Sequence, residues 1–422
     1  MIVSGTHGGN ICELAHVLQG LGYDGPMPPT WESPVFYLVT TAGYPNFGDE
    51  LILSGWLRHL ARVAPRATVW VDTHSPGPVQ MLLGDAHPGV RFTDTLWRLC
   101  WEAPSEDPWE VASWVQHAVA NPGLAPRWHQ GIMALRTLDV VHVVGGGFVN
   151  AIWPRHVGLL AGAAAAARHS GARLAMTGQG LAPEPPGSAP LLRALADRFD
   201  IVDVRDAPSA ELLGMEVGEV GIDDAFLTVG TERTVDPREV WPDGPGPAVM
   251  VCLQSDLNQV GTAAVAGATL SMLRAWGVRG DQVCVVEGIP RVDREVYALI
   301  EHELPGAAFY PFVDVWERGL PVAPGQTWIS TRFHLHMAAA TAGAGGVAMA
   351  ISPDYYAIKH QSLIDLGSGW TLLEDMSQVP PRPSGRGFPA GAVDKLRRDK
   401  IALARAVYGP AVHTQADQNR VS

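Results

Sequence analysis

Short runs of apolar residues alternate with longer amphipathic stretches along most of this chain. Runs rich in β-branched residues predict strands, and the stretches between them have the periodicity of helices. The strands predicted in this way are residues 35–40, 67–72, 138–144, 173–177, 201–204, 248–253, 282–287, 327–330 and 347–352. Strand–helix alternation at this spacing indicates parallel strands joined by right-handed crossovers.

This pattern predicts an α/β fold with two Rossmann-like, doubly wound domains facing a cleft. A chain of 422 residues is too long for one ordinary core, which supports the division into two. A stretch rich in Pro and Gly breaks the pattern near the middle and is expected to be a linker. The expected parts are an N-terminal arm (1–35), an N-terminal α/β domain (36–235), the linker (236–247), a C-terminal α/β domain (248–392), and a C-terminal helix and tail (393–422).

Composition limits the classes of partner. The formal net charge of −13 argues against nucleic acid or an anionic membrane as the main partner, so a cationic site must be local and inside a cleft. The N-terminus lacks the pattern of a signal peptide, and the longest apolar stretch, 157–167, is about half the length that crosses a bilayer. We therefore expect a cytoplasmic protein without stable membrane insertion. The four cysteines lie far apart without metal-ligand spacing, so no metal is expected.

The most informative stretch runs from Trp328 to Ala340, where an apolar strand is followed by Ser330 and Thr331 and then by a helical run. Ser and Thr favour helix N-caps, so Arg332 and His334 are expected in the first turn of the helix. Free backbone N–H groups and the helix dipole favour an anion there. Taken alone, however, this pair is also explained by a surface Arg–carboxylate pair and a His packed in the core.

Polar residues and glycines follow other predicted strands. Asn46 and Asp49 follow the first strand and are expected to point into the cleft, although both residue types also cap helices and turn loops. Gly145, Gly146 and Gly147 would let a ligand or a backbone segment come close, but they match neither G-x-G-x-x-G nor a P-loop. Arg205 also follows a strand, where it would clamp an anion or pair with a surface Asp.

Short motifs follow one another along the chain in this order: Gly43-x-x-Asn46-x-Gly48-Asp49, Val144-Gly145-Gly146-Gly147, Gly178-Gln179-Gly180-x-x-Pro183, Val204-Arg205-Asp206-x-x-Ser209, Asp223-Asp224-Ala225-Phe226, Ser330-x-Arg332-x-His334 and Tyr356-x-x-Lys359. In this order they resemble the motifs of the polysaccharide pyruvyl transferase family. The likeness spans about residues 36–366, with Asp224 at a position where the family often has Pro.

The resemblance implies a fold like that of GT-B glycosyltransferases. It also implies transfer of a pyruvyl group from phosphoenolpyruvate to two hydroxyls of one sugar, giving a cyclic ketal in a polysaccharide or glycolipid, without a metal or other cofactor. In the family an Arg, a His and a Lys contact the donor, and these roles fall on Arg205, His334 and Lys359.

These residue types suit the chemistry. Arg and Lys neutralise phosphate and carboxylate groups, and a His near neutrality can both give and take a proton. We therefore expect His334 to be the general acid/base, and Arg332, Lys359, Arg205 and Ser330 to bind the donor. The residues expected on the acceptor side or in the cleft are Asn46, Asp49, Gly145, Gly146, Gly147 and Gln179.

Two other functions are compatible with the same architecture. A GT-B nucleotide-sugar glycosyltransferase would recruit an acidic residue near the diphosphate, such as Glu287 or Asp314. A non-catalytic glycan-binding member of the family is the second. The sequence leaves open the acceptor sugar, its lipid linkage, the formation of a homo-oligomer and the role of residues 75–135. Some of the many Trp side chains could stack on sugar rings, although most such residues fill cores.

Overall fold

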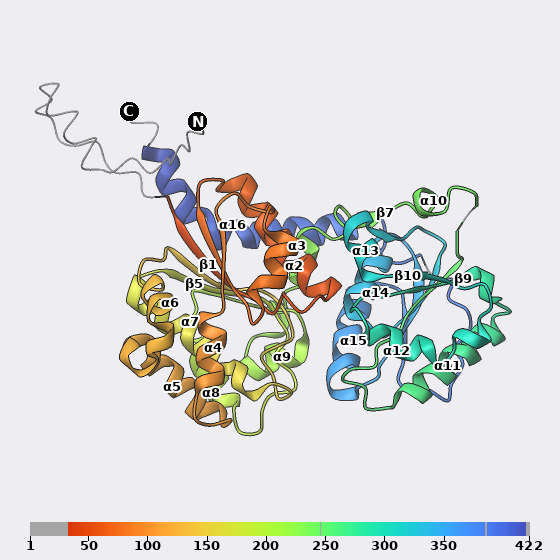
Figure 1. Cartoon of the computed structure of the whole chain (residues 1–422), viewed down its shortest axis with the longest axis horizontal. Coiled ribbons are helices and arrows are strands. Elements are labelled where there is room, and N and C mark those ends of the chain that lie inside the picture. The colour runs from red at the N-terminus through yellow and green to blue at the C-terminus, as the bar shows by residue number, and fades with distance from the viewer. Residues whose placement is uncertain (1–32, 245, 385, 419–422) are drawn as a thin grey trace, which may run out of the picture.

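The computed structural model describes residues 33–244, 246–384 and 386–418 (Figure 1). Nearly all of the expected N-terminal arm (1–35) and the last four residues of the expected tail lie outside these ranges. The described chain forms two α/β halves, each built around a six-stranded parallel sheet.

The N-terminal half contains a sheet with strand order β3-β2-β1-β4-β5-β6. Its strands are β1 (Val35–Val39), β2 (Thr68–Asp72), β3 (Val90–Thr93), β4 (Val140–Val143), β5 (Arg173–Gln179) and β6 (Ile201–Val204). Its helices are α2 (Phe47–Val63), α3 (Pro76–Leu83), α4 (Thr95–Glu102), α5 (Pro108–Ala120), α6 (His129–Ala134), α7 (Val157–Ser170), α8 (Ala189–Ala196) and α9 (Ala207–Leu213).

The C-terminal half repeats the same strand order in β10-β9-β8-β12-β13-β14. Its strands are β8 (Val249–Cys252), β9 (Val283–Val286), β10 (Ala308–Tyr310), β12 (Thr327–Ser330), β13 (Gly345–Met349) and β14 (Thr371–Leu373). Its helices are α11 (Thr262–Ala275), α12 (Val292–Ala298), α13 (Phe312–Arg318), α14 (Phe333–Thr341) and α15 (Ile358–Asp365), and a π-helical turn, Pro353–Ala357, precedes α15.

Both faces of each sheet are buried, which explains why the strands appear in the sequence as continuous apolar runs. In β1, Phe36 and Leu38 face a core shared with α2, whereas Tyr37 and Val39 face a second core shared with α4, α5 and α7. Helices therefore cover both faces, as in a doubly wound fold. The first of these cores continues into the C-terminal half, where Leu335 of α14 belongs to it.

The segment between the two sheets has structure of its own. A short parallel pair joins β7 (Thr234–Val235) to β11 (Leu320–Pro321), and α10 (Pro237–Val240) lies within the predicted linker 236–247. The exact domain boundaries remain predictions.

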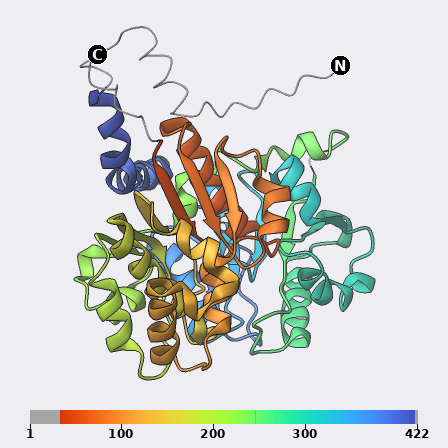
Figure 2. The ribbon, with the colours of Figure 1, turned by 60° about the vertical axis from the view of Figure 1, so that its left-hand side comes forward.

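The C-terminal helix α16 (Ala392–Gln418) runs from the C-terminal half back along the N-terminal half (Figures 1 and 2). The hydroxyl of Tyr408 lies 2.7 Å from Nδ1 of His142 on β4. The ammonium of Lys400 lies 2.8 Å from a carboxylate oxygen of Asp203 and 3.0 Å from one of Asp224. Buried polar contacts thus hold α16 against the first sheet. No helix in the described ranges is both long and apolar enough to span a membrane.

Candidate active site

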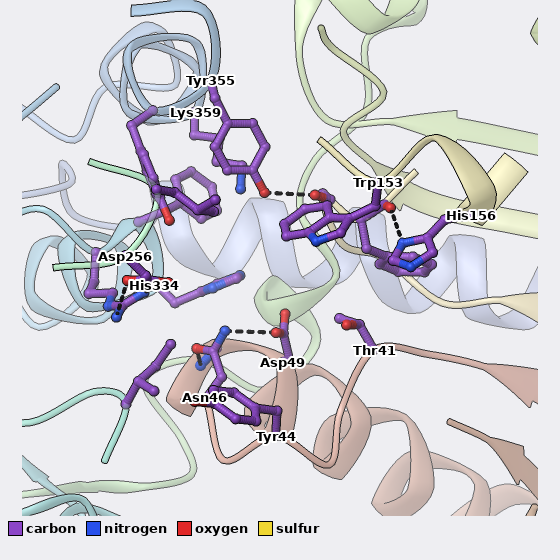
Figure 3. Close-up of a pocket in the computed structure, with 18 of the residues that line it drawn as sticks. Thr41, Tyr44, Asn46, Asp49, Trp153, His156, Asp256, His334, Tyr355 and Lys359 are labelled. Carbon is purple, nitrogen blue, oxygen red and sulfur yellow. Dashed lines mark hydrogen bonds and ion pairs between the residues drawn. The ribbon is translucent and has the colours of Figure 1, made fainter. Parts of the chain in front are cut away.

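A cavity of about 580 Å³ lies between the two halves (Figure 3). Many of the residues that line it lie in the segments that follow strands of both sheets, for example Thr41 after β1, Gly147 after β4, Asp256 after β8 and Arg332 after β12. Ligands of open α/β sheets bind outside the carboxyl ends of the strands, so the cavity has the position expected of a ligand site.

Of the residues predicted from the sequence, seven line this cavity, and they come from both halves: Asn46, Asp49, Gly147, Arg205, Arg332, His334 and Lys359. Four do not line it: Ser330, Gly145, Gly146 and Gln179. Glu287 and Asp314, the acidic residues considered for a nucleotide-sugar reaction, also lie outside the lining. The contacts of Ser330, Gly145, Gly146 and Gln179 explain their positions outside the lining.

Gly145, Gly146 and Gln179 support the site from behind. The Gly145 N–H donates to Asp224 at 2.8 Å, and an added Cβ at Gly145 would come within 2.7 Å of that carboxylate carbon. An added Cβ at Gly146 would meet the ring of Phe148. The buried Gln179 amide donates to the carbonyls of Val143, Val144 and Thr177, which ties β4 to β5.

Gly147 lines the cavity, and the basic side chains of Arg205 and Lys359 lie close to its backbone. An added Cβ there would lie 2.8 Å from Nη2 of Arg205 and 2.9 Å from Nζ of Lys359. The Gly147 carbonyl also accepts a hydrogen bond of 2.7 Å from the Tyr355 hydroxyl, which comes from the other half of the protein. The absence of a side chain at this position therefore lets Arg205 and Lys359 approach the same point.

Asn46 has both of the roles considered for it. It is the N-cap of α2, with its Oδ1 accepting from the Gly48 N–H at 3.2 Å, and it lines the cavity. Its amide donates to Asp49 at 2.7 Å. Burial raises the pKa of the Asp49 carboxyl, although His334, Lys359 and Arg205 act to lower it. Asp49 thus lies close to the basic side chains of all three residues.

Arg205 is buried and paired with Asp223 by a hydrogen bond of 2.6 Å from Nη1. Its guanidinium carbon lies 4.9 Å from the ring centre of Phe333. Burial acts to lower the pKa of Arg205, but Asp223 and the nearby Asp206 outweigh it, so the guanidinium stays charged. Its Nε has no hydrogen-bond partner within the described chain. A buried donor without a partner is costly, which favours a ligand at this position.

His334 extends from the first turn of α14 to the N-terminal half. Its Nε2 lies 3.4 Å from Oδ1 of Asp223, too poorly oriented for a hydrogen bond, and has no other partner among the residues described. Burial acts to raise the pKa of Asp223, but His334 and Arg205 outweigh it and hold that pKa below its usual range. An added Cβ at Gly48 would lie only 1.8 Å from Nδ1 of His334, so the imidazole lies directly against the start of α2.

Lys359 lies on α15, with its ammonium 3.4 Å from the ring centre of Tyr355 and 5.2 Å from that of Tyr356. Burial, followed by the charge of Arg205, holds the pKa of Lys359 well below its usual value. An anion bound beside it would offset both effects and favour the protonated amine.

Arg332 differs from the expectation in two respects. It is the N-cap residue of α14 rather than part of the first turn, and its backbone N–H donates to Ser330 at 3.0 Å. Ser330 is fully buried, so its hydroxyl shapes the turn from outside the cavity. The Arg332 guanidinium already holds two carboxylates, Asp293 at 2.5 Å and Asp256 at 2.8 Å. These two carboxylates would compete with an anionic ligand for the guanidinium.

Sequence reasoning assigned no role to several residues of the site. Asp223 belongs to a motif that was recognised, but its pairing with both Arg205 and His334 depends on folding. Asp256 follows β8, so the rule that strand ends carry ligand groups would have found it. Tyr355 comes directly before a motif residue and gave no separate pattern. Within the described ranges, no group of three or more His, Cys, Asp or Glu side chains is arranged to hold a metal ion.

The fold and the site together define the class of protein. Two Rossmann-like halves with a cavity at their facing strand ends form the fold of GT-B enzymes. Among solved structures, a UDP-N-acetylglucosamine 2-epimerase is similar to this chain with 11% identity and a TM-score of 0.52, covering 92% of this chain and 97% of the other. The Methanocaldococcus jannaschii UDP-GlcNAc 2-epimerase, in complex with UDP-GlcNAc and UDP, has 12% identity, a TM-score of 0.50, and coverage of 88% and 99%.

Sequence comparison gives the family. The profile of the family described as polysaccharide pyruvyl transferase matches residues 46–353. The chain belongs to the polysaccharide pyruvyl transferase family. A comparison with curated proteins gives no match.

Proposed function

We propose that the protein transfers a pyruvyl group from phosphoenolpyruvate to two hydroxyls of one sugar and so forms a pyruvate ketal. The observation that supports this most strongly is that Arg205, His334 and Lys359 converge on one cavity in a chain of this family. Arg205 and His334 share the carboxylate of Asp223, and Lys359 meets Arg205 at Gly147. Groups suited to bind an anionic donor and a histidine suited to carry a proton therefore meet in one cavity.

The donor has a phosphate and a carboxylate, so its site needs more than one cation. Arg205 offers an Nε without a partner, and Lys359 offers an ammonium that a bound anion would keep protonated. In the proposed arrangement these two groups bind the donor and stabilise the departing phosphate. Arg332 already pairs with Asp256 and Asp293 in this structure. In the proposed arrangement it contributes to donor binding when the donor displaces Asp256.

In the proposed reaction, the enol carbon of the donor forms two C–O bonds to the sugar and loses its bond to the phosphate oxygen. The methylene carbon gains a proton and becomes a methyl group. One of the two hydroxyl protons ends on that carbon and the other on the released phosphate, so no further reactant is needed. His334, whose Nε2 has no hydrogen-bond partner in the described chain, is the group proposed to move these protons.

The acceptor is proposed to bind from the N-terminal half. Asn46 and Asp49 line the cavity on the opposite side from Lys359 and Tyr355 (Figure 3). A carboxylate and an amide are suitable partners for sugar hydroxyls. Because Asp49 comes from one half and His334 from the other, the attacking hydroxyl would be held between the N-terminal half and the proposed proton carrier.

Calorimetric titration with phosphoenolpyruvate tests this proposal, with UDP-glucose and GDP-mannose as comparison ligands. We expect saturable binding of phosphoenolpyruvate that Arg205→Ala and Lys359→Met each weaken by about tenfold or more. Matched controls are Arg274→Ala and Lys395→Met, whose side chains are exposed and outside the cavity, and they should bind like the wild type.

Lys359→Met leaves the buried Arg205–Asp223 pair in place, so it tests the donor site even if Arg205→Ala fails to fold. Binding of a nucleotide sugar without binding of phosphoenolpyruvate would reject the proposal in favour of a glycosyltransferase.

A further inference from the structure

One wall of the cavity is aromatic and takes no part in the proposed reaction. It comes from the N-terminal half, and two of its members, Trp97 and Trp101, lie on α4 in the segment 75–135 that the sequence left unassigned. Its members, which are joined by ring contacts, are His74, Trp97, Trp101, Phe148, Trp153 and His156. We call this set the aromatic wall. Trp97 is buried and donates to the Thr40 carbonyl, which is the behaviour of a core residue. The other tryptophans need a different explanation.

Trp153 connects the aromatic wall to the cationic groups. Its ring centre lies 6.3 Å from that of Tyr355 in an edge-to-face arrangement, and the Tyr355 ring also carries the Lys359 ammonium. Figure 3 shows Trp153 between Tyr355 and His156, on the opposite side of the cavity from Asp49 and Asn46. A sugar ring stacked on Trp153 would therefore have its hydroxyls close to Tyr355 and Lys359, where the donor is proposed to bind.

The wall extends from Trp153 towards solvent. Trp153 stacks on His156 with ring centres 5.8 Å apart and planes at 11°, and His156 meets Trp101 edge-on at 6.3 Å. Trp101 is 55% exposed although it lines the cavity. Arg155 holds the end of α4 by donating to the carbonyls of Cys100 and Ala103, so the backbone that carries Trp101 is fixed. Trp101, His156 and Trp153 thus form a contiguous aromatic surface in the cavity, and such patches mark binding sites.

The aromatic wall suits an uncharged ligand with apolar faces. Burial lowers the pKa of His156 to about 4 and also lowers that of His74, so both rings are neutral near pH 7. The C–H bonds on one face of a pyranose ring are weakly positive and apolar, and the faces of Trp rings are negative and apolar. A cavity of about 580 Å³ has room for such a ring besides a small donor.

We propose that Trp153 and Trp101 form two consecutive sugar-stacking subsites, the inner one for the sugar that is modified and the outer one for its neighbour. This rests on the proposed function and specifies its substrate class: an acceptor of at least two linked sugars rather than a free monosaccharide. The segment that contains α4 then has a role, because it supplies the outer subsite.

Saturation-transfer NMR on the full chain tests this without turnover. The aromatic protons of the protein are irradiated. The probes are the methyl glycosides of glucose, galactose, mannose and the corresponding N-acetylhexosamines, together with the β-linked methyl disaccharides built from them. We expect transfer to ring protons of at least one disaccharide, with about tenfold tighter binding than its monosaccharide. Trp101→Ala should remove that preference, whereas Trp153→Phe should weaken both probes. The control is Trp109→Ala, since Trp109 is similarly exposed (48%) but lies outside the cavity.

The outcomes separate this inference from the proposed function. Binding of phosphoenolpyruvate, together with no transfer to any sugar or with equal disaccharide preference in Trp101→Ala and Trp109→Ala, would overturn the stacking subsites and leave pyruvyl transfer standing. Sugar binding that depends on Trp101, without any binding of phosphoenolpyruvate, would support the stacking subsites and overturn pyruvyl transfer. Trp101 is exposed, so its removal should not prevent folding.

Discussion

Nε2 of His334 lies 3.4 Å from Oδ1 of Asp223, and this contact connects the C-terminal half of the protein to the N-terminal half. Oδ2 of the same carboxylate accepts a 2.6 Å hydrogen bond from Arg205. One buried acid therefore orients the proposed proton carrier and a proposed donor-binding cation at once. Because the contact crosses between the halves, the site is complete only when they are held together.

Asp223→Asn should impair both turnover and stability. The amide removes the carboxylate that pairs directly with the buried Arg205 and leaves only the nearby charge of Asp206, which costs about 3–5 kcal/mol of unfolding free energy. Loss of the group that orients His334 should lower turnover by about 10- to 100-fold. Urea denaturation and phosphate release from phosphoenolpyruvate measure the two effects. Asp394→Asn, which removes an exposed pair with Arg397, should change stability by about 1 kcal/mol or less. Equal behaviour of the two variants would contradict this prediction.

Gly48→Ala should displace His334 while the helix that carries the change stays intact. An added Cβ at Gly48 would lie 1.8 Å from Nδ1 of His334, so the imidazole must move away from Asp223. We expect turnover to fall by about 100-fold, with little change in the thermal midpoint, because Ala is a better helix former than Gly. Gly77→Ala is the matched control, because no atom lies within 4 Å of the Cβ it would add. Wild-type turnover in Gly48→Ala would show that the position of His334 does not matter.

Lys359 should make donor binding depend on pH. Burial and Arg205 lower the pKa of Lys359 in the free protein, and a bound anion should raise it again. Binding should then take up a proton, and the affinity for phosphoenolpyruvate should fall as pH rises through the lowered pKa. Calorimetry in buffers of different ionisation enthalpy measures this uptake. Lys359→Met should lose part of the uptake, and Lys395→Met should retain all of it; identical proton uptake in the two variants would exclude the amine as its source.

Glu50 should destabilise the protein progressively as the pH rises from about 4.5 to about 8. This carboxyl is fully buried, and burial raises its pKa to about 8, although the Gly43 N–H donates to it. Between about pH 4.5 and pH 8 the folded protein binds a proton that the unfolded chain has released, so stability falls as pH rises across this window. Glu50→Gln cannot titrate, and its stability relative to wild type should increase by several kcal/mol from pH 5 to pH 8.5 in urea denaturation. A constant difference over that range would be incompatible with a buried, protonated Glu50.

Strong local patterns made most of the fold predictable from the sequence. Strands such as β4 are buried on both faces, so their continuous apolar runs stand out, and the parallel two-half architecture follows from the alternation. The segment 75–135 was not ordered because three of its helices, α3, α4 and α6, have eight residues or fewer, and because α3 and α5 begin with prolines, Pro76 and Pro108. Both occupy the first helical position, where proline is favoured. The short edge strand β3, with Arg91 exposed, lacks the apolar run of a central strand.

The site was only partly predictable, because its chemistry depends on partners distant in the chain. The order of motifs led to His334, Arg205 and Lys359, and the fold brings all three into one cavity. The sequence could not show that Asp256 and Asp293 form ion pairs with the guanidinium of Arg332, since neither residue lies near Arg332 in the chain. It also could not distinguish Gln179, which ties two strands together, from a residue that faces the ligand.

The central claim is that this cavity forms a pyruvate ketal from phosphoenolpyruvate. Its most direct test uses phosphoenolpyruvate labelled with ¹³C at the enol carbon, a set of oligosaccharide acceptors, and mass spectrometry of the sugars alongside phosphate release. The account predicts a labelled sugar with the mass of the acceptor plus pyruvic acid minus water, and an equal amount of phosphate. His334→Ala should still bind the donor but form this product about 10²- to 10⁴-fold more slowly, and His129→Ala, an exposed control, should not. Donor binding without any labelled sugar, or full activity in His334→Ala, would contradict the account.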